Sequence, residues 1–368
     1  MAVISFARGV PAPDCLPVDE LADCARAAVL ADGTRVLSYG PGGGYPPLRE
    51  WLAQRHGVEP GRVVATNGSL EGFVLLARLL LRGDSRRVLV EAPTYDRPLK
   101  ILAGLGAEVE ALPMDDEGLE PDALAEALER GPQPAFLYTI PTFQNPSGRT
   151  LSTERRRRVV ELARAYDLLV YEDDPYGLVR FEGEPPPTLH ELEGGERIVY
   201  ASSFSKTAAP GIRVGYLVLP AGLAEAVEAA AVGTYISPPF LTQATLLEFI
   251  RRGSFEPNLE RVRGLLRARR DAMLDALDRE LPEGARWSHP EGGYFIWLDL
   301  PDGLQTDEVA SGAAEAGIAF VNGSDFFPGG AGGQSSIRLA YSFASVEEIG
   351  EGVARLARLL APTAATAL

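Results

Sequence analysis

The sequence predicts an α/β protein that combines a large domain, built on a mostly parallel sheet, with a smaller α+β domain. The chain has 368 residues, which is long for one compact domain. Over its first two thirds, continuously apolar and β-branched segments alternate with amphipathic ones, as expected for strands that helices cover on both faces. After a long amphipathic segment at residues 258–281, shorter strands and helices follow, which indicates a second domain.

In the large domain, the first helix is expected at residues 46–56, with proline at its start and Gly57 just past its end. A second helix is expected from Ser69 to Leu81 and a third one from Ser152. Strands are expected where β-branched apolar residues run together, at residues 63–66, 87–93, 135–140, 167–173, 197–203 and 213–219.

The long helix at residues 258–281 is expected to link the two domains. The elements expected after it are strands at 294–300, 317–321 and 336–342 and a last helix at 345–360. The domain boundaries that follow are 1–35 for an N-terminal arm belonging to the small domain, 36–257 for the large domain, and 258–368 for the linking helix and the small domain.

Composition excludes several classes of function. The formal net charge of −16 argues against binding to nucleic acid or to an acidic membrane, because phosphate groups repel an acidic protein. The chain lacks a secretory signal and any run of about 18 apolar residues, so we expect a cytoplasmic protein. Two cysteines, Cys15 and Cys24, do not make a disulfide framework or a zinc site here, and we expect free thiols and no metal.

Lysine is rare in this sequence. Among the 35 Lys and Arg residues, only Lys100 and Lys206 are lysines. A guanidinium group cannot replace an amine that has to lose its proton and attack a carbonyl carbon. The two lysines are therefore the first candidates for covalent chemistry.

Lys206 follows a predicted strand in the motif Ser203-Phe204-Ser205-Lys206, and Arg213 comes shortly after it. Serine hydroxyls and a guanidinium group beside a lysine amine could hold a phosphate dianion. A surface lysine in a serine-rich turn is the alternative, since short motifs often occur by chance. The scarcity of lysine favours the functional interpretation.

Two further motifs follow predicted parallel strands, at the edge where open α/β sheets build their sites. Asn145-Pro146-Ser147-Gly148 by itself indicates only a turn. Glu172-Asp173-Asp174-Pro175-Tyr176 places three acids at the end of an apolar strand, which is costly unless they are used or solvated. A carboxylate there could face a pyridinium nitrogen, and the Tyr176 hydroxyl could bind an oxygen on the same ring.

Other candidate residues have an equally plain structural alternative. Gly68 and Ser69 precede a helix whose free N–H groups could bind phosphate, although Ser69 could simply cap the helix. Tyr95 could stack on a flat cofactor or pack in the core. Arg338 lies in an apolar stretch and needs an anion, either a substrate carboxylate or an internal acid. The glycine-rich loop at 39–45 lacks the spacing of dinucleotide and P-loop motifs.

In their joint order, these motifs resemble the fold-type I enzymes that depend on pyridoxal 5′-phosphate (PLP), namely the class I and II aminotransferases. The resemblance covers nearly the whole chain, and it is closest to the subgroup of α-aminoadipate and kynurenine aminotransferases. It implies a large domain with a mostly parallel sheet of the seven-stranded type. The matching segments are ISFARGVPAPDCLP, YGPGGGYPPLREWLA, NGSLEG, EAPTYD, TIPTFQNPSG, YEDDPY, SFSKTAAPGIRVGY and PEGGYFIWLDL.

The resemblance also implies catalytic roles. Lys206 would hold PLP as an aldimine and later carry the substrate proton. Asp173 would pair with the pyridine nitrogen of PLP. Arg338, together with Asn145, would bind the α-carboxylate of the substrate.

Further roles concern the ring and the phosphate of PLP. Asn145 and Tyr176 would contact the 3′-oxygen of the ring, and Tyr95 would stack on it. The protein would be a homodimer with shared sites, in which Tyr39 reaches the phosphate in the partner subunit. The other residues around the phosphate would be Gly68, Ser69, Leu70, Ser203, Ser205 and Arg213.

The reaction implied is transamination between an α-amino acid and a 2-oxo acid by a ping-pong mechanism. The same residues would also serve elimination, decarboxylation, oxidation or cyclisation of an amino acid. A non-enzymatic effector-binding domain is a third interpretation, because some bacterial regulators carry this fold. The chain has no basic patch for DNA, which argues against that interpretation.

Three features of the sequence bear on the substrate or on the phosphate contacts. Residues 231–237, before Pro238-Pro239, lack the arginine that aspartate aminotransferases use, so we expect aspartate to be a poor donor. Arg8 replaces a glycine, and we expect it at the side-chain end of the site, where it would accept glutamate or 2-oxoglutarate while an apolar or aromatic amino acid serves the other half-reaction. An arginine in an arm more commonly points to solvent. Leu70 replaces the usual glutamine near the phosphate.

Overall fold

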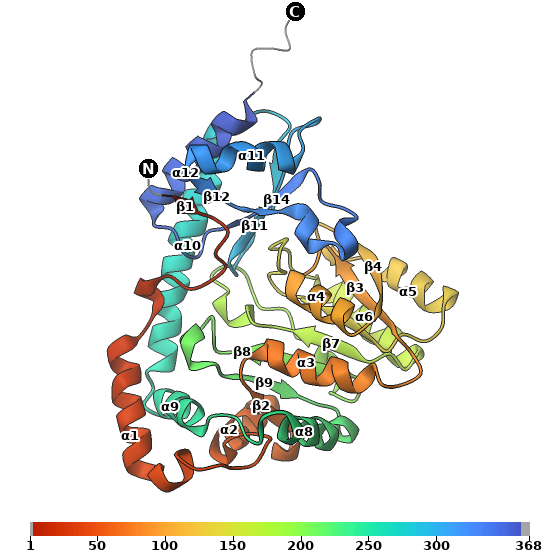
Figure 1. Ribbon diagram of the computed structural model, residues 1–368, viewed down its shortest axis with the longest axis vertical. Coiled ribbons are helices and arrows are strands. Elements are labelled where there is room, and N and C mark those ends of the chain that lie inside the picture. Colours follow the sequence, from red (N-terminus) through yellow and green to blue (C-terminus); the bar gives the residue numbers. More distant parts are fainter. Residues whose placement is uncertain (1–2, 362–368) are drawn as a thin grey trace, which may run out of the picture.

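An eight-stranded sheet forms the centre of the larger part of the molecule (Figure 1). The computed structural model describes residues 3–361. The strands of this sheet, in spatial order, are β2 (Val63–Thr66), β9 (Gly215–Val218), β8 (Ile198–Ser203), β7 (Val170–Asp173), β6 (Phe136–Thr139), β3 (Arg87–Ala92), β4 (Glu108–Asp115) and β5 (Gly118–Leu119).

The sheet is mostly parallel, which confirms the expectation from the sequence. Neighbouring strands from β4 to β8 run parallel, whereas β9 is antiparallel to both β2 and β8. The eighth strand, β5, has two residues and pairs antiparallel with the end of β4. This short strand is why the sheet has one strand more than the seven-stranded type.

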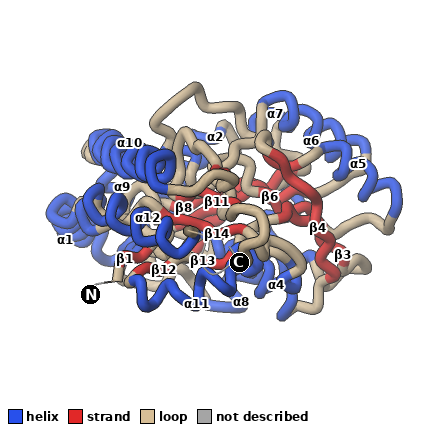
Figure 2. The backbone as a smooth tube through the Cα atoms, turned by 90° about the horizontal axis from the view of Figure 1, so that it is seen from above, coloured by secondary structure: helices blue, strands red, loops and turns tan. Residues whose placement is uncertain are grey.

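Helices cover both faces of the sheet, as the continuously apolar strands predict. Viewed from above, α5, α6 and α7 lie on one side of the strands, and α4 and α8 lie on the other (Figure 2). Alternate residues of the strands fill separate cores: Leu137 and Val170 pack with the α5–α6 side, and Tyr138 and Tyr171 pack with the other. The helices of this part are α2 (Pro46–His56), α3 (Ser69–Leu80), α4 (Asp96–Gly104), α5 (Pro121–Arg130), α6 (Thr153–Ala165), α7 (Leu189–Glu193), α8 (Ala221–Tyr235) and α9 (Phe240–Arg251).

A second, smaller group of elements lies above the large sheet (Figure 1). The long helix α10 connects the two parts, and it runs from Phe255 to Glu280, close to the predicted range. The expected strand at 317–321 is instead two short strands that belong to different sheets. The remaining elements are β10 (Arg286–Trp287), β11 (Phe295–Asp299), α11 (Thr306–Ala316), β12 (Ile318–Ala319), β13 (Val321–Asn322), β14 (Ser336–Ala340) and α12 (Val346–Leu360).

The N-terminal segment joins the smaller group through a short strand. β1 (Ile4–Ser5) pairs parallel with β12, and the chain then contacts α10 before it reaches α1 (Val18–Val36). The sequence pattern does not indicate helix α1, whose apolar residues are partly exposed. α1 packs along α9, so its stability comes from a helix that is distant in the sequence.

Helix ends follow the local signals in the sequence. Gly57 ends α2 in the left-handed conformation, as predicted. Helix α3 begins at Ser69 and its N-cap is Gly68, so the alternative that Ser69 caps this helix is wrong. The Ser69 side chain is therefore left to face the space in front of the helix, which bears on the site.

Cys15 and Cys24 are buried free thiols, as expected. Within residues 3–361, no helix combines the length and the apolar character needed to cross a bilayer. In the same residues, no cluster of His, Cys, Asp and Glu has the arrangement of a metal site.

Candidate active site

A cavity of about 480 Å³ lies between the carboxyl ends of the central strands and the smaller group of elements. Its walls come from the turn before α3, the ends of β7 and β8, strands β11 and β14, and the N-terminal arm. Every residue that the sequence predicts for the site lines this cavity except Tyr39. The predicted residues that line it are Arg8, Gly68, Ser69, Leu70, Tyr95, Asn145, Asp173, Tyr176, Ser203, Ser205, Lys206, Arg213 and Arg338.

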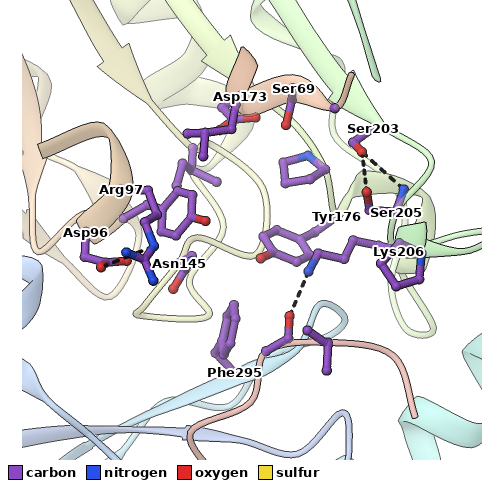
Figure 3. A pocket seen from close by; sticks show the side chains of 18 of the residues that line it. Ser69, Asp96, Arg97, Asn145, Asp173, Tyr176, Ser203, Ser205, Lys206 and Phe295 are labelled. Carbon is purple, nitrogen blue, oxygen red and sulfur yellow. Dashed lines mark hydrogen bonds and ion pairs between the residues drawn. The ribbon is translucent and has the colours of Figure 1, made fainter. Parts of the chain in front are cut away.

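Lys206 reaches into the cavity from the turn after β8 (Figure 3). Its Nζ atom donates a hydrogen bond of 2.8 Å to the Gly9 carbonyl oxygen and lies 4.9 Å from the centre of the Tyr294 ring. Burial, together with the guanidinium groups of Arg338 and Arg213, lowers the pKa of Lys206 to about 8. An amine with this pKa is partly neutral near pH 7 and can act as a nucleophile or a base.

Asp173 and its neighbour Asp174 have different surroundings at the end of β7. Asp173 lines the cavity, and only its Oδ2 has a hydrogen-bond partner, the Tyr138 hydroxyl at 2.8 Å. Asp174 is outside the cavity lining and accepts hydrogen bonds from the Tyr200 hydroxyl and the Gly177 amide. Burial raises the pKa of Asp173 to about 7, so its free oxygen would gain from a cationic N–H partner.

Hydroxyls and backbone N–H groups gather at one end of the cavity, where α3 begins. Ser69 is the first residue of the helix, and the Ser203 hydroxyl lies 2.9 Å from that of Ser205. The Arg213 guanidinium donates to the Asn67 carbonyl oxygen. Gly68 has a φ of 94°, a backbone conformation that residues with a side chain rarely adopt, which explains the glycine there. A helix N-terminus with hydroxyls and a guanidinium group suits a phosphate dianion.

Arg338 enters from β14 on the other side of the cavity, next to Asn145. Its Nη1 donates to Asn145 Oδ1 at 2.9 Å and its Nη2 to the Ala7 carbonyl oxygen at 2.9 Å. The side chain is 7% exposed, its Nε has no partner, and it forms no ion pair among the described residues. Arg338 therefore does not pair with an acid among the described residues, which was the structural alternative. Its positive charge is available to an anion that enters the cavity.

Two predicted tyrosines, Tyr95 and Tyr176, also line the cavity. Tyr176 is buried, and its ring lies 5.6 Å from the Tyr294 ring and from Lys206 Nζ. Burial raises the pKa of both Tyr95 and Tyr176, so both hydroxyls keep their protons and can donate hydrogen bonds.

The remaining two predicted residues differ from this group. Arg8 is exposed at the mouth of the cavity, and its guanidinium carbon lies 5.0 Å from the centre of the Phe343 ring. Tyr39 is 82% exposed and lies outside the cavity lining of its own chain.

The cavity also contains residues that the sequence motifs do not indicate. Among them, Arg97 and Asp96 lie beside Asn145 in Figure 3, on the side opposite Lys206. Both residues directly follow Tyr95 after the end of β3, and this position in the sequence could have indicated that they line the cavity. The other missed residues are Ala7, Gly9, Val10, Ile140, Pro175, Pro210 and Phe295, most of which are small or apolar and carry no chemical signature.

Comparison with known proteins fits this arrangement. The family "Aminotransferase class I and II" matches residues 3–356. The chain belongs to the class I and II aminotransferases. Its fold is the fold type I of PLP-dependent enzymes, and its cofactor is PLP.

Relatives of this aminotransferase match it over nearly its whole length. The 2-aminoadipate transaminase of Thermus thermophilus is 39% identical over 97% of this chain and 90% of its own. Aromatic-amino-acid aminotransferase 1 of Thermococcus litoralis is 34% identical over 97% of this chain and 88% of its own. The crystal structure of the α-aminoadipate aminotransferase LysN from Thermus thermophilus, complexed with N-(5′-phosphopyridoxyl)-L-leucine, superimposes with a TM-score of 0.92 at 38% identity, covering 97% of this chain and 92% of that one.

The protein is thus a PLP-dependent aminotransferase that acts on amino acids and 2-oxo acids. The residues of the cavity fit the cofactor on their own chemistry. A lysine amine, a buried carboxylate oxygen without a partner, and a cradle of hydroxyls and N–H groups suit the carbonyl, the ring nitrogen and the phosphate of PLP.

Proposed function

We propose that Lys206 binds PLP covalently and that Asp173 Oδ1 faces the ring nitrogen. Support comes from the lowered pKa of Lys206 and from the unpartnered Asp173 oxygen in the same cavity. In this proposal Asn145 and Tyr176 contact the 3′-oxygen of the ring, and Tyr95 stacks on it. The residues proposed around the phosphate are Gly68, Ser69, Leu70, Ser203, Ser205 and Arg213.

The chain's own groups then have distinct parts in transamination. The bound cofactor supplies an electron-poor ring that withdraws electrons from the substrate Cα. Arg338 and Asn145 hold the substrate α-carboxylate and thereby orient the Cα–H bond. Lys206 Nζ accepts the Cα proton and delivers it again later in the cycle. Asp173 keeps its negative charge beside the ring nitrogen.

The proposal that the substrate is an amino acid bound by its α-carboxylate rests on the guanidinium group of Arg338. It is buried, it lacks an acid partner among the described residues, and it shares a cavity with Lys206. A buried cation of this kind is strongly stabilised by an anion that arrives with the substrate. A bidentate carboxylate matches the planar guanidinium group.

Transfer of ¹⁵N from a labelled amino acid to a 2-oxo acid tests this function. The wild-type enzyme should form one labelled amino product for each 2-oxo acid released from the donor, which elimination or decarboxylation would not produce. Arg338→Ala should lower kcat/KM for amino acids by roughly 100-fold, because two charged hydrogen bonds are lost. Arg97→Ala, which removes another cation from the same cavity, is the matched control. A small loss in Arg338→Ala, equal to that of the control, would contradict the assignment.

We also propose that the enzyme is a homodimer with shared sites, in which Tyr39 binds the cofactor phosphate of the partner subunit. In support, Tyr39 is highly exposed, and so are the apolar side chains of Leu37, Val232 and Ile236. The loop after Tyr39 packs on α8, because a Cβ atom at Gly42 would meet Val232. Exposed aromatic and aliphatic groups that gather in this way are typical of subunit interfaces.

For the substrate side chain, we propose a dicarboxylic amino acid or its oxo acid in one half-reaction and an apolar or aromatic amino acid in the other. The names of relatives that act on 2-aminoadipate and on aromatic amino acids support both classes. Arg8 is the residue proposed to meet the second carboxylate, since it lines the cavity mouth and has no acidic partner among the described residues.

We propose, finally, that the chain divides into an arm at 1–35, a large domain at 36–257, and a linking helix with the small domain at 258–368. The pairing of β1 with β12 supports placing the start of the arm with the small domain. Limited proteolysis that cuts between these ranges would test the division.

A further inference from the structure

Tyr138 lies behind the active site and does not line its cavity. It is in β6, its side chain is 0% exposed, and its hydroxyl donates a hydrogen bond of 2.8 Å to Asp173 Oδ2. The sequence gives no sign of a role for Tyr138, because it is one of several apolar or aromatic residues in a buried strand. It cannot touch the substrate from this position.

Strand register explains why Tyr138 meets Asp173. β6 and β7 are parallel, and Tyr138 is opposite Tyr171 in the ladder. Side chains two residues apart share a face of a strand, so Asp173 projects on the same side as Tyr171 and Tyr138. The Tyr138 ring is also held by Phe73, whose ring centre is 5.1 Å away in an edge-to-face arrangement. The phenol is therefore fixed against one oxygen of Asp173.

This hydrogen bond gives the two carboxylate oxygens of Asp173 different surroundings. Oδ2 is occupied by Tyr138, whereas Oδ1 is buried without a partner. The carboxylate group is thus held in one orientation, and Oδ1 is available to the cofactor. Burial raises the pKa of Tyr138 well above its ordinary value, so the phenol remains a proton donor.

The hydrogen bond also affects how strongly Asp173 attracts a proton. Burial and the nearby acids Asp174 and Glu91 raise the pKa of Asp173, whereas the Tyr138 hydroxyl and Lys206 lower it. A donor to a carboxylate makes that carboxylate a weaker base. If a ring nitrogen and Asp173 share one proton, a weaker carboxylate base leaves the proton on the nitrogen.

We propose that Tyr138 is a positioning residue that keeps the cofactor ring protonated, by fixing the Asp173 carboxylate through Oδ2 and weakening it as a base. The inference rests on the proposed contact between Asp173 and the ring nitrogen. When Tyr138 is lost, the proton shifts from the nitrogen toward Asp173 Oδ1, and the ring becomes a weaker acceptor of electrons. No other bond is made or broken in this shift.

The test uses holoenzyme loaded with PLP that carries ¹⁵N in the ring, followed by NMR over a range of pH. In Tyr138→Phe, the pH midpoint at which the nitrogen loses its proton should fall, and the resonance at a fixed pH should move toward that of an unprotonated pyridine. The proton distribution should change roughly ten- to a hundred-fold, the size expected for one hydrogen bond to a charged group. kcat should fall by a similar factor, and KM for the amino acid should stay within about twofold, because Tyr138 does not contact the substrate.

Tyr171→Phe is the matched control. Tyr171 is equally buried beside Tyr138, but its hydroxyl bonds to the Ser69 carbonyl oxygen at 3.3 Å instead of to Asp173. This variant should leave the nitrogen midpoint at the wild-type value. A second change, fluorotyrosine at position 138, avoids the loss of the hydroxyl and makes the phenol a stronger donor, so the midpoint should rise.

Two outcomes separate this inference from the proposed role of Asp173. If Asp173→Ala keeps the wild-type nitrogen resonance, the contact between Asp173 and the ring is wrong. If Asp173→Ala changes the resonance while Tyr138→Phe and the fluorotyrosine enzyme both keep the wild-type midpoint, only the role of Tyr138 is overturned.

Discussion

Lys206 Nζ donates a 2.8 Å hydrogen bond to the carbonyl oxygen of Gly9, which ties this lysine of the cavity to the N-terminal arm. The same arm accepts a hydrogen bond from Arg338 at Ala7. Asp14, further along the arm, forms an ion pair with the buried Arg269 on α10, whose Nη2 donates to both carboxylate oxygens. The arm therefore closes one side of the cavity by contacts with both Lys206 and Arg338.

Attachment of PLP to the apoenzyme should depend on pH through Lys206. Its pKa is lowered to about 8, first by burial and then by Arg338, so the reactive neutral amine is present at lower pH than for an ordinary lysine. The rate of attachment should rise with pH up to about 8 and then level off. Arg338→Ala removes a cation and should move the midpoint to higher pH. Absorbance stopped-flow at several pH values measures both curves, and an unshifted midpoint in the variant would contradict the electrostatic origin.

Reduction of the holoenzyme with borohydride should attach a phosphopyridoxyl group to Lys206. The only other lysine, Lys100, is on the exposed side of α4 and pairs with Asp96 at 2.7 Å. Mass spectrometry of the digested protein locates the modification. Labelling of Lys100 in place of Lys206 would overturn the assignment, and Lys100→Arg serves as a control that should label normally.

Asp173→Ala should retain some cofactor and lose kcat by several orders of magnitude, because the ring nitrogen loses its anionic partner. Asp174→Ala should instead lose stability, by about 1–3 kcal/mol, because the Tyr200 hydroxyl and the Gly177 amide lose their acceptor. Steady-state kinetics and thermal unfolding of both variants measure the difference. If Asp174→Ala lost most of its kcat while Asp173→Ala lost little, the roles of the two residues would be reversed.

Mixing an inactive Tyr39→Ala variant with an inactive Lys206→Ala variant should restore activity. If the sites are shared, each heterodimer contains one site in which both residues are intact. Subunit exchange followed by activity assays and sedimentation tests this expectation. A monomer in sedimentation, or a mixture that stays inactive after proven exchange, would remove the shared-site proposal.

Arg8→Ala should reduce kcat/KM for glutamate about fivefold more than for an apolar amino acid, the size of a partly exposed ion pair. Arg97→Ala is the comparison, because Arg97 lines the same cavity but pairs with Asp96 at 3.8 Å. Steady-state kinetics of both variants, with glutamate and with an apolar amino acid as donors, measure the loss of kcat/KM for each donor. Equal losses for the two donors in Arg8→Ala would leave Arg8 without a role in specificity.

Much of the fold and of the candidate site could be predicted, because the signals were local. Pro46 and Gly57 mark the two ends of α2, and β-branched runs mark the central strands. Helix α1 was missed because its stability comes from packing on α9, which a local pattern does not contain. The strand expected at 317–321 was split for a similar reason, since its halves pair with β1 and with β14.

The sequence by itself determined which residue types carry the chemistry and in what order, above all a lysine that is one of two in the chain. The residue pattern left Asp173 and Asp174 as adjacent candidates, and the family resemblance pointed to Asp173. The strand register turns Asp173 into the cavity and Asp174 toward Tyr200. Nothing in the sequence indicated that Tyr138 would meet Asp173. Such contacts depend on how strands pair across long distances in the chain, and a one-residue change of register would send each side chain to the opposite face.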